Sequence, residues 1–146
     1  MSARADAGMR AVSRVREIRE RDSRIGVQQA AAELRAREAT LADLQQRAAA
    51  TQSSDQSIEA YLRSRDYLTA LGEQIVVTER SVAAAATLTD SALAHWRVDR
   101  TRLGAVELLL ERRAEVRRQE RALEESKRLD EAAALLWQRR QGGAVA

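Results

Sequence analysis

Proline and cysteine are absent from this 146-residue chain, and glycine occurs only six times. Because proline ends or kinks a helix, its absence allows helices much longer than the ~11–12 residues typical of globular proteins. Without cysteine there is no disulfide framework and no thiolate chemistry. Phenylalanine is also absent, and the aromatic residues are Tyr61, Tyr67, Trp96 and Trp137. The chain therefore lacks the large side chains from which a thick globular core is built.

Signals for membranes and for catalysis are also missing. No apolar run approaches the ~18 residues of a membrane-spanning helix, and residues 1–8 lack the apolar region of a secretory signal. We therefore expect a cytoplasmic protein. The only histidine, His95, has no cysteine or second histidine with which to share a metal, and no glycine-rich phosphate loop occurs. We expect a protein that is not an enzyme, with no catalytic residue, metal, cofactor or small-molecule substrate.

Charge of both signs is abundant instead. Charged residues make up 32% of the chain, yet the net charge is only +3. They are interspersed with alanine and leucine, which is typical of a thin helical seam with charged flanks rather than of a disordered tail. The sequence therefore predicts a solvated helical protein with little concave surface.

The chain divides into two helical segments around one polar cluster. We expect a first helix from about 9 to 50, a turn at about 51–57 capped by Asp55 or Ser57, and a second helix from about 58 to 141. The ends should be frayed, and residues 1–146 should form a single coiled-coil domain. The first helix has two apolar series: Ala11, Val15, Ile18 and Ile25, then Val27, Ala30, Leu34, Leu41, Leu44 and Ala48. Their change of phase near Gly26 predicts a stutter in the supercoil.

The second helix carries the more regular pattern, with apolar residues that alternate at spacings of three and four. Its apolar members are Leu68, Leu71, Ile75, Val82, Ala85, Ala92, Trp96, Leu103, Val106 and Leu110, and its polar members are Thr78, Thr89, Asp99 and Arg113. A sustained repeat of this kind wraps one helix on another, and a short turn makes the two antiparallel. The expected fold is all-α, a long antiparallel two-helix coiled-coil hairpin with the second helix longer than the first. Beyond its partner, the second helix either projects alone or bends near Gly104 and folds back.

Two basic clusters could indicate nucleic-acid binding. The first contains Arg112, Arg113, Arg117, Arg118 and Arg121, but glutamates interleave with it and would repel phosphate, which favours a solvated or protein-binding face. The second contains Arg10, Arg14, Arg16, Arg19, Arg21 and Arg24, and fewer acidic residues accompany it. A charged partner surface and an ordinary solvated face both remain open for this cluster. We expect no nucleic acid among the partners.

The second helix carries an ordered series of short motifs: Trp96-Arg97, Arg102-Leu103, Leu110-Glu111-Arg112, Glu120-Arg121 and Lys127-Arg128-Leu129-Asp130-Glu131 with Ala133. In this series it resembles FliJ, a flagellar export protein. The resemblance covers about Tyr61 to Trp137, while the first helix is similar only in pattern. The chain length and the helix–turn–helix layout are also similar.

The resemblance implies a stalk that links an export ATPase hexamer (FliI-like) to a membrane export gate protein (FlhA-like), at the inner face of the cell membrane at the flagellar base. It also leaves export chaperones as candidate partners. The strip that docks on the gate would fall on Tyr67, Leu71, Gln74 and Thr78. The contact with the ATPase ring is expected where the two chain termini come together. It would include Val12, Val15, Arg16, Ile18, Arg19, Arg21 and Trp137.

Two other functions remain compatible with the residues alone. A generic coiled-coil scaffold that pairs with itself would have the same heptads, and a basic helical hairpin could bind nucleic acid. A change in the activity of an export ATPase when the protein is added would favour the stalk over the generic scaffold. Tight, sequence-selective binding in a gel-shift titration at physiological salt would favour nucleic acid instead.

Overall fold

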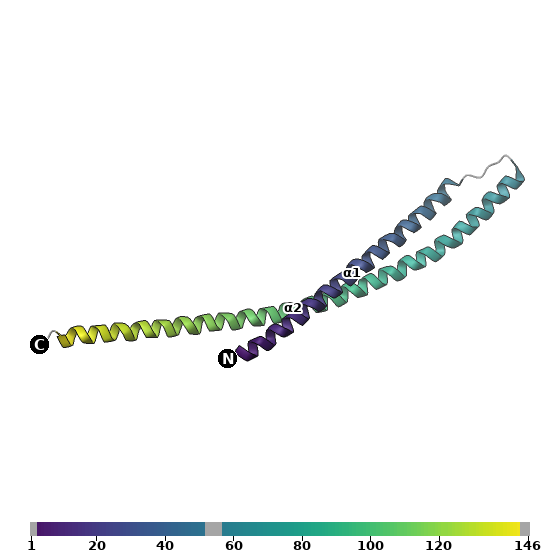
Figure 1. Ribbon diagram of the computed structural model, residues 1–146. Helices are drawn as coiled ribbons and strands as arrows, with labels where there is room; N and C mark the ends of the chain where they lie inside the picture. Colours follow the sequence, from purple (N-terminus) through teal and green to yellow (C-terminus); the bar gives the residue numbers. More distant parts are fainter. Residues whose placement is uncertain (1–2, 52–56, 144–146) are drawn as a thin grey trace. The chain divides into compact units, whose positions relative to one another are not determined.

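The computed structural model describes residues 3–51 and 57–143, which form two α-helices (Figure 1). Helix α1 spans Ala3–Ala50, and helix α2 spans Ile58–Gly143 and is the longer one. The all-α fold with two helices packed against each other is therefore as predicted. The first helix begins earlier than expected, because Asp6 in its first turn complements the helix dipole and pairs with Arg113 and Arg117 of α2.

Side chains next to the turn terminate α1 and start α2. The amide and the hydroxyl of Thr51 both donate to the Arg47 carbonyl, at 3.1 and 2.8 Å, which satisfies one of the last carbonyls of α1. The Ser57 hydroxyl accepts a hydrogen bond from the Ala60 amide at 3.1 Å, in the arrangement of an N-cap. Ser57 is thus confirmed as a cap, while the other candidate, Asp55, lies outside the described residues.

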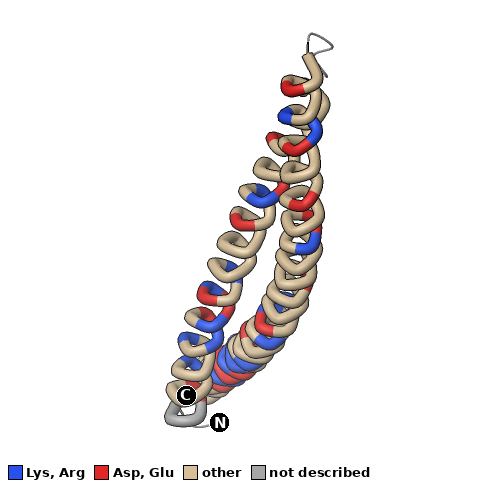
Figure 2. The backbone as a smooth tube through the Cα atoms, turned by 90° about the vertical axis from the view of Figure 1, so that its right-hand side faces the viewer, with Lys and Arg blue, Asp and Glu red and all other residues tan. Residues whose placement is uncertain are grey.

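The chain divides into two compact units. The hairpin unit is Val15–Arg102, and the terminal unit combines Met1–Arg14 with Leu103–Ala146. Helix α2 continues as one α-helix through Gly104, so the predicted alternative of a fold-back does not occur. Figure 2 shows Lys and Arg interspersed with Asp and Glu along both helices, as the composition predicts.

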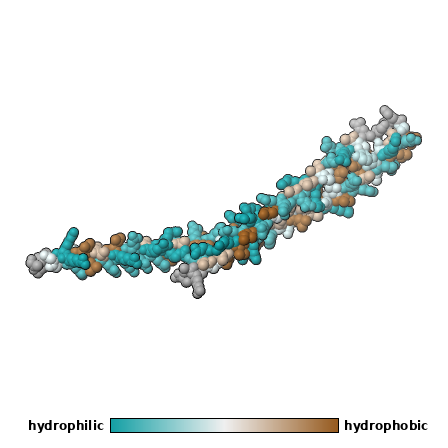
Figure 3. Space-filling view, in the orientation of Figure 1, coloured by the Kyte–Doolittle hydropathy of each residue, from teal (hydrophilic) through white to brown (hydrophobic). Residues whose placement is uncertain are grey.

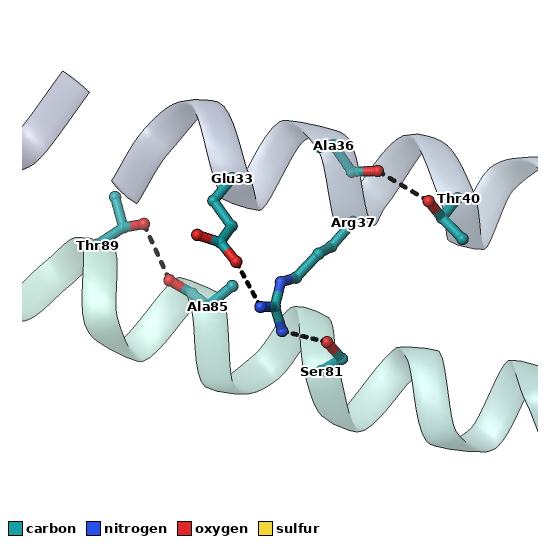
Figure 4. A network of polar contacts seen from close by, with 7 residues as sticks. All are labelled: Glu33, Ala36, Arg37, Thr40, Ser81, Ala85 and Thr89. Carbon is teal, nitrogen blue, oxygen red and sulfur yellow. Dashed lines mark hydrogen bonds and ion pairs between the residues drawn. The ribbon is translucent and has the colours of Figure 1, made fainter. Parts of the chain in front are cut away.

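In the hairpin unit, α1 and α2 run antiparallel along one seam. Arg37 contacts Ser81, and Glu20 contacts Trp96. Residues earlier in α1 thus contact residues later in α2, as in an antiparallel pair. On α2 the positions that are buried or half-buried include Leu71, Ile75, Thr78, Val82, Ala85, Thr89, Ala92, Trp96 and Asp99. These are the predicted seam residues of this unit, including the polar ones, with one exception: Leu68, predicted to lie in the seam, is exposed. Figure 4 shows how Arg37 reaches across from α1 to Ser81 while it also pairs with Glu33.

The predicted stutter near Gly26 is wrong. On α1 the covered positions keep the three-four spacing through this point: Arg16, Glu20, Ser23, Val27, Ala30, Leu34, Arg37, Leu41, Leu44 and Ala48. Val15, Ile18 and Ile25, which the sequence placed in the seam, are exposed. The reason is the rigidity of an unbroken helix. Once Val27 to Ala48 face α2, every earlier residue follows at a fixed ~100° per residue, and this brings Glu20 and Ser23 inward.

The terminal unit contains a long stretch of α2 without cover. Leu103 is buried, Val106, Leu110, Arg113 and Arg117 are buried in part, and every described residue from Arg118 to Gly143 is exposed. Trp137 lies in the same helix 20 residues beyond Arg117, the partner of Asp6, a distance of about 30 Å along the axis. The expected meeting of the two termini therefore does not occur within the described residues. The N-terminal end of α1 lies near Arg117, and α2 continues well beyond that residue.

Glycine inside α2 serves no packing purpose and offers a test of helix stability. Gly72 has open space around the position of a Cβ atom and no positive φ. Gly72→Ala should therefore raise the free energy of unfolding by about 0.5–1 kcal/mol, because alanine restricts the unfolded chain and favours the helix. Urea unfolding followed by circular dichroism measures the change. Gly142→Ala, at the end of the helix, should change it less, and a loss of stability in Gly72→Ala would contradict the assignment.

Candidate partner-binding surfaces

The described surface offers grooves and exposed patches rather than an enclosed cavity. Figure 3 shows small hydrophobic areas scattered over a largely hydrophilic surface. Within residues 3–51 and 57–143, no cluster of His, Cys, Asp or Glu could hold a metal ion. In the same residues, neither helix has a stretch long and apolar enough to cross a membrane.

The four residues predicted to form the gate-docking strip separate into different environments. Leu71 is only 4% exposed and belongs to the seam, whereas Tyr67 is 47% exposed. Gln74 is exposed, and Thr78 is half-buried with its hydroxyl donating to the Gln74 carbonyl at 2.8 Å. Tyr67 and Leu71 lie on the same side of α2, but Tyr67 stands at the rim of the seam and Leu71 inside it.

An open groove lies along this rim. Thr40 and Leu44 line it from α1, and Ala70, Glu73, Gln74, Val77 and Thr78 line it from α2. Tyr67, Ala70, Gln74 and Val77 follow one another at spacings of three and four, so one face of α2 carries them all. Val77 is exposed and is the apolar residue that the sequence reasoning missed. The sequence signal was that Val77 directly precedes Thr78, a polar residue at a seam position, so that the apolar side chain falls beside the seam.

Polar contacts hold the end of the hairpin unit that lies away from the turn. The indole Nε1 of Trp96 donates to the buried Glu20 carboxylate at 2.9 Å. The Ser23 hydroxyl donates to the buried Asp99 carboxylate at 2.8 Å, and the exposed His95 has its Nε2 3.4 Å from the same oxygen. Trp96 is thus confirmed as a seam residue. A second groove beside these contacts is lined by Arg19, Asp22, Ser23, His95, Asp99 and Arg102.

The residues predicted to contact the ATPase ring are mostly exposed. Val12, Val15 and Ile18 are all exposed, Ile18 at 57%, and so are Arg19 and Arg21. Arg16 differs, because it is half-buried at a seam position with its Nη1 atom covered. Trp137, in the terminal unit, is 63% exposed. All but Arg16 are therefore exposed to solvent, and their contact with a ring stays a prediction.

The basic cluster of the terminal unit is largely paired with carboxylates. Arg113 lies 3.6 Å from Asp6, and Arg117 donates a hydrogen bond to the same carboxylate. Arg118 donates to Glu115, with Nε at 2.9 Å, and this hydrogen bond and the nearby positive charge lower the pKa of Glu115. Arginines engaged in this way are poorly placed to follow a phosphate backbone, which supports the expectation of no nucleic-acid partner.

The chain matches the model of a known protein family. The family model described as flagellar FliJ protein matches residues 7–142, which is nearly the whole chain and includes α1 as well as α2. Comparison with curated proteins gave no match, and comparison with solved structures gave none.

The different burial of Tyr67 and Leu71 can be tested by stability. Leu71→Ala should lower the free energy of unfolding by about 2 kcal/mol or more, because it leaves a cavity in the seam. Tyr67→Ala should change it much less, since its side chain is half exposed. Leu88→Ala is the matched control, because Leu88 is exposed on the same helix. Equal losses in Leu71→Ala and Leu88→Ala, measured by urea unfolding, would show that Leu71 is not a seam residue.

Proposed function

Because the chain belongs to the FliJ family, it is a component of the flagellar protein export apparatus, and within that apparatus we propose that it is a non-enzymatic stalk. In this proposal the protein links the hexameric export ATPase to the membrane export gate. It acts in the cytoplasm, at the inner face of the membrane at the flagellar base. The family match carries the proposal, and two separate exposed surfaces support it.

The surface proposed for the ATPase ring is the first part of α1. In the hairpin unit it combines the exposed aliphatic side chains of Val15 and Ile18 with the exposed arginines Arg19 and Arg21, and Val12 of the terminal unit is proposed as a contact of its own. Apolar side chains can anchor a contact, while arginines steer an acidic surface toward it and fix its orientation. Trp137 is proposed as a further anchor on α2. The proposal leaves Arg16 out of direct contact, because its burial makes it part of the seam.

The surface proposed for the export gate is the rim of α2 that carries Tyr67, Gln74 and Val77, with Thr78 beside them. Aromatic side chains such as that of Tyr67 are frequent anchors of protein interfaces. The groove along this rim gives the partner a recessed surface that residues of both helices line. Leu71 keeps α2 in place from within the seam, so its contribution to gate binding is indirect.

Coupling between the two partners follows from differential contact. A bound protein shifts an equilibrium only by binding one state better than another. A stalk that contacts the subunits of a ring unequally therefore favours a different nucleotide state in each. Because the helices are rigid, a change in the state of the ring moves the part of the stalk that contacts the gate. The protein itself hydrolyses no nucleotide.

The ATPase contact is tested with the purified hexamer of the same organism. The unmodified protein should raise the rate of ATP hydrolysis or promote ring assembly. Arg19→Glu with Arg21→Glu should weaken this effect, because an acidic lining would repel the reversed charges. Arg80→Glu with Arg100→Glu is the matched control, since both arginines are exposed on α2. No change in rate, assembly or co-elution with the unmodified protein would remove the stalk proposal.

The gate contact is tested with the cytoplasmic part of the gate protein. Tyr67→Ala with Val77→Gln should lower its affinity by about tenfold or more, as expected for loss of one aromatic and one aliphatic anchor. Helicity by circular dichroism should stay unchanged, because both residues are exposed. Tyr61→Ala serves as the control, since Tyr61 has nearly the same exposure. Equal binding by all variants in a calorimetric titration would exclude this rim as the docking site.

A further inference from the structure

Helix α1 carries a second heptad series on the side away from α2. Its members are Val15, Ile18, Asp22, Ile25, Gln29, Ala32 and Ala36, at alternating spacings of three and four, and all are exposed. We call these residues the outer stripe. Each is shifted by two residues from a seam position such as Glu20, Ser23 or Val27, a rotation of about 200°. The outer stripe therefore runs along the opposite side of α1 from the seam.

The polarity of α1 is inverted over Val15–Ile25. The side toward α2 holds Glu20 and Ser23, which make polar contacts with Trp96 and Asp99. The outward side holds β-branched residues, with Ile18 57% and Ile25 43% exposed. A single exposed isoleucine is ordinary, but a repeat of 3.5 residues is the pattern by which one helix packs on another. The outer stripe thus has the form of a coiled-coil seam that lacks its second helix.

Charges beside the outer stripe indicate the kind of helix that fits. Val15, Asp22 and Gln29 occupy one core position of the heptad, and Ile18, Ile25 and Ala32 occupy the other. The flanking positions, which set partner choice in coiled coils, hold Arg21 and Arg35 on one side, and Arg19 and Glu33 on the other. Glu33 already pairs with Arg37. The uncompensated charge along the stripe is therefore positive.

This charge also argues against pairing of two copies of the chain. In an antiparallel pair, flanking positions of the same kind face each other, so arginines such as Arg21 and Arg35 would lie opposite arginines. Like charges at such positions are destabilising. An acidic partner would instead find opposite charges on its flanks. Ala32 and Ala36 leave room for close approach.

We propose that the outer stripe binds one amphipathic helix of a partner protein, with apolar residues at its core positions and glutamate or aspartate at its flanks. This helix packs along α1 from Val15 to Ala36 and becomes the third helix of a coiled coil with the hairpin. The inference rests on the proposed function, because the surface proposed for the ATPase ring also includes Val15, Ile18, Arg19 and Arg21. It adds which kind of helix this surface binds. It also extends that surface to Ile25 and Ala36.

The test uses the full chain and two labelled synthetic peptides of four heptads each. Both have leucine at the core positions, and one has glutamate and the other lysine at the flanks. The glutamate peptide should bind, by fluorescence anisotropy, at least about tenfold more tightly than the lysine peptide, and less tightly at high salt. Ile18→Gln with Ile25→Gln should weaken its binding by at least about tenfold, because two apolar anchors are lost.

Leu88→Gln with Val98→Gln is the matched control, since both residues are exposed and apolar on α2. This variant should bind the glutamate peptide like the unmodified chain, and circular dichroism should show equal helicity for both variants. Equal affinity for the two peptides, or unchanged binding by Ile18→Gln with Ile25→Gln, would overturn the proposal. A dimer in sedimentation analysis that dissociates in this variant would also overturn it, because a second copy would then cover the stripe.

Cross-linking tests which side of α1 faces α2 in solution. The chain has no cysteine of its own, so introduced pairs report this directly. Ser23→Cys with Asp99→Cys should form a disulfide on oxidation, because these side chains touch at 2.8 Å. Ile25→Cys with Asp99→Cys should not. Efficient cross-linking of the second pair and not of the first would overturn the proposal.

The ATPase assay separates this inference from the proposed function. If the glutamate peptide binds at the stripe while the unmodified chain has no effect on the ATPase, the stalk proposal fails and the helix-binding stripe stands. If the chain stimulates the ATPase and neither peptide binds, the ring contact stands and the third helix is excluded.

Discussion

The fixed rotation of an unbroken α-helix is the constraint on which the other features depend. Helix α1 runs from Ala3 to Ala50 without a proline or a left-handed residue. Its apolar residues from Val27 to Ala48 decide which side faces α2, and the rest of the helix must follow. Glu20 and Ser23 are thereby carried into the seam, and Ile18 and Ile25 are carried out of it. The proposed contact surface on α1 thus follows from the packing of its last part against α2.

Glu20 and Ser23 are tolerated in the seam because each has a partner on α2. Glu20 accepts from Trp96, and Asp99 accepts from Ser23. Buried polar pairs of this kind add little net stability, yet removing one partner is costly. Among the described residues only Leu44, Leu71, Ala85 and Leu103 are buried hydrophobic side chains. With so thin a core, the polar pairs contribute to fixing the alignment of the two helices, as single polar core positions do in coiled coils.

The seam of α2 could be predicted from sequence because its repeat persists over many heptads, so that even Thr78, Thr89 and Asp99 are placed by their neighbours. The first part of α1 could not, because it offers two heptad series and only the position of α2 decides between them. Tyr67 and Leu71 show a similar limit. Four residues apart, they share a side of the helix, and the ~40° between them separates rim from seam. Periodicity gives directions around a helix, but burial depends on the opposite helix.

The antiparallel arrangement also orders the contacts by chain separation. Arg37 and Ser81 are 44 residues apart, Glu20 and Trp96 are 76 apart, and Asp6 and Arg117 are 111 apart. Closing a loop costs more entropy as it lengthens, and local contacts form sooner than distant ones. Folding should therefore begin near the turn and proceed like a zipper toward the open end. In the reverse direction, the paired part of the two helices would open first at Asp6 and its arginines, so within this part amide exchange should be fastest there and slowest around Leu44 and Leu71.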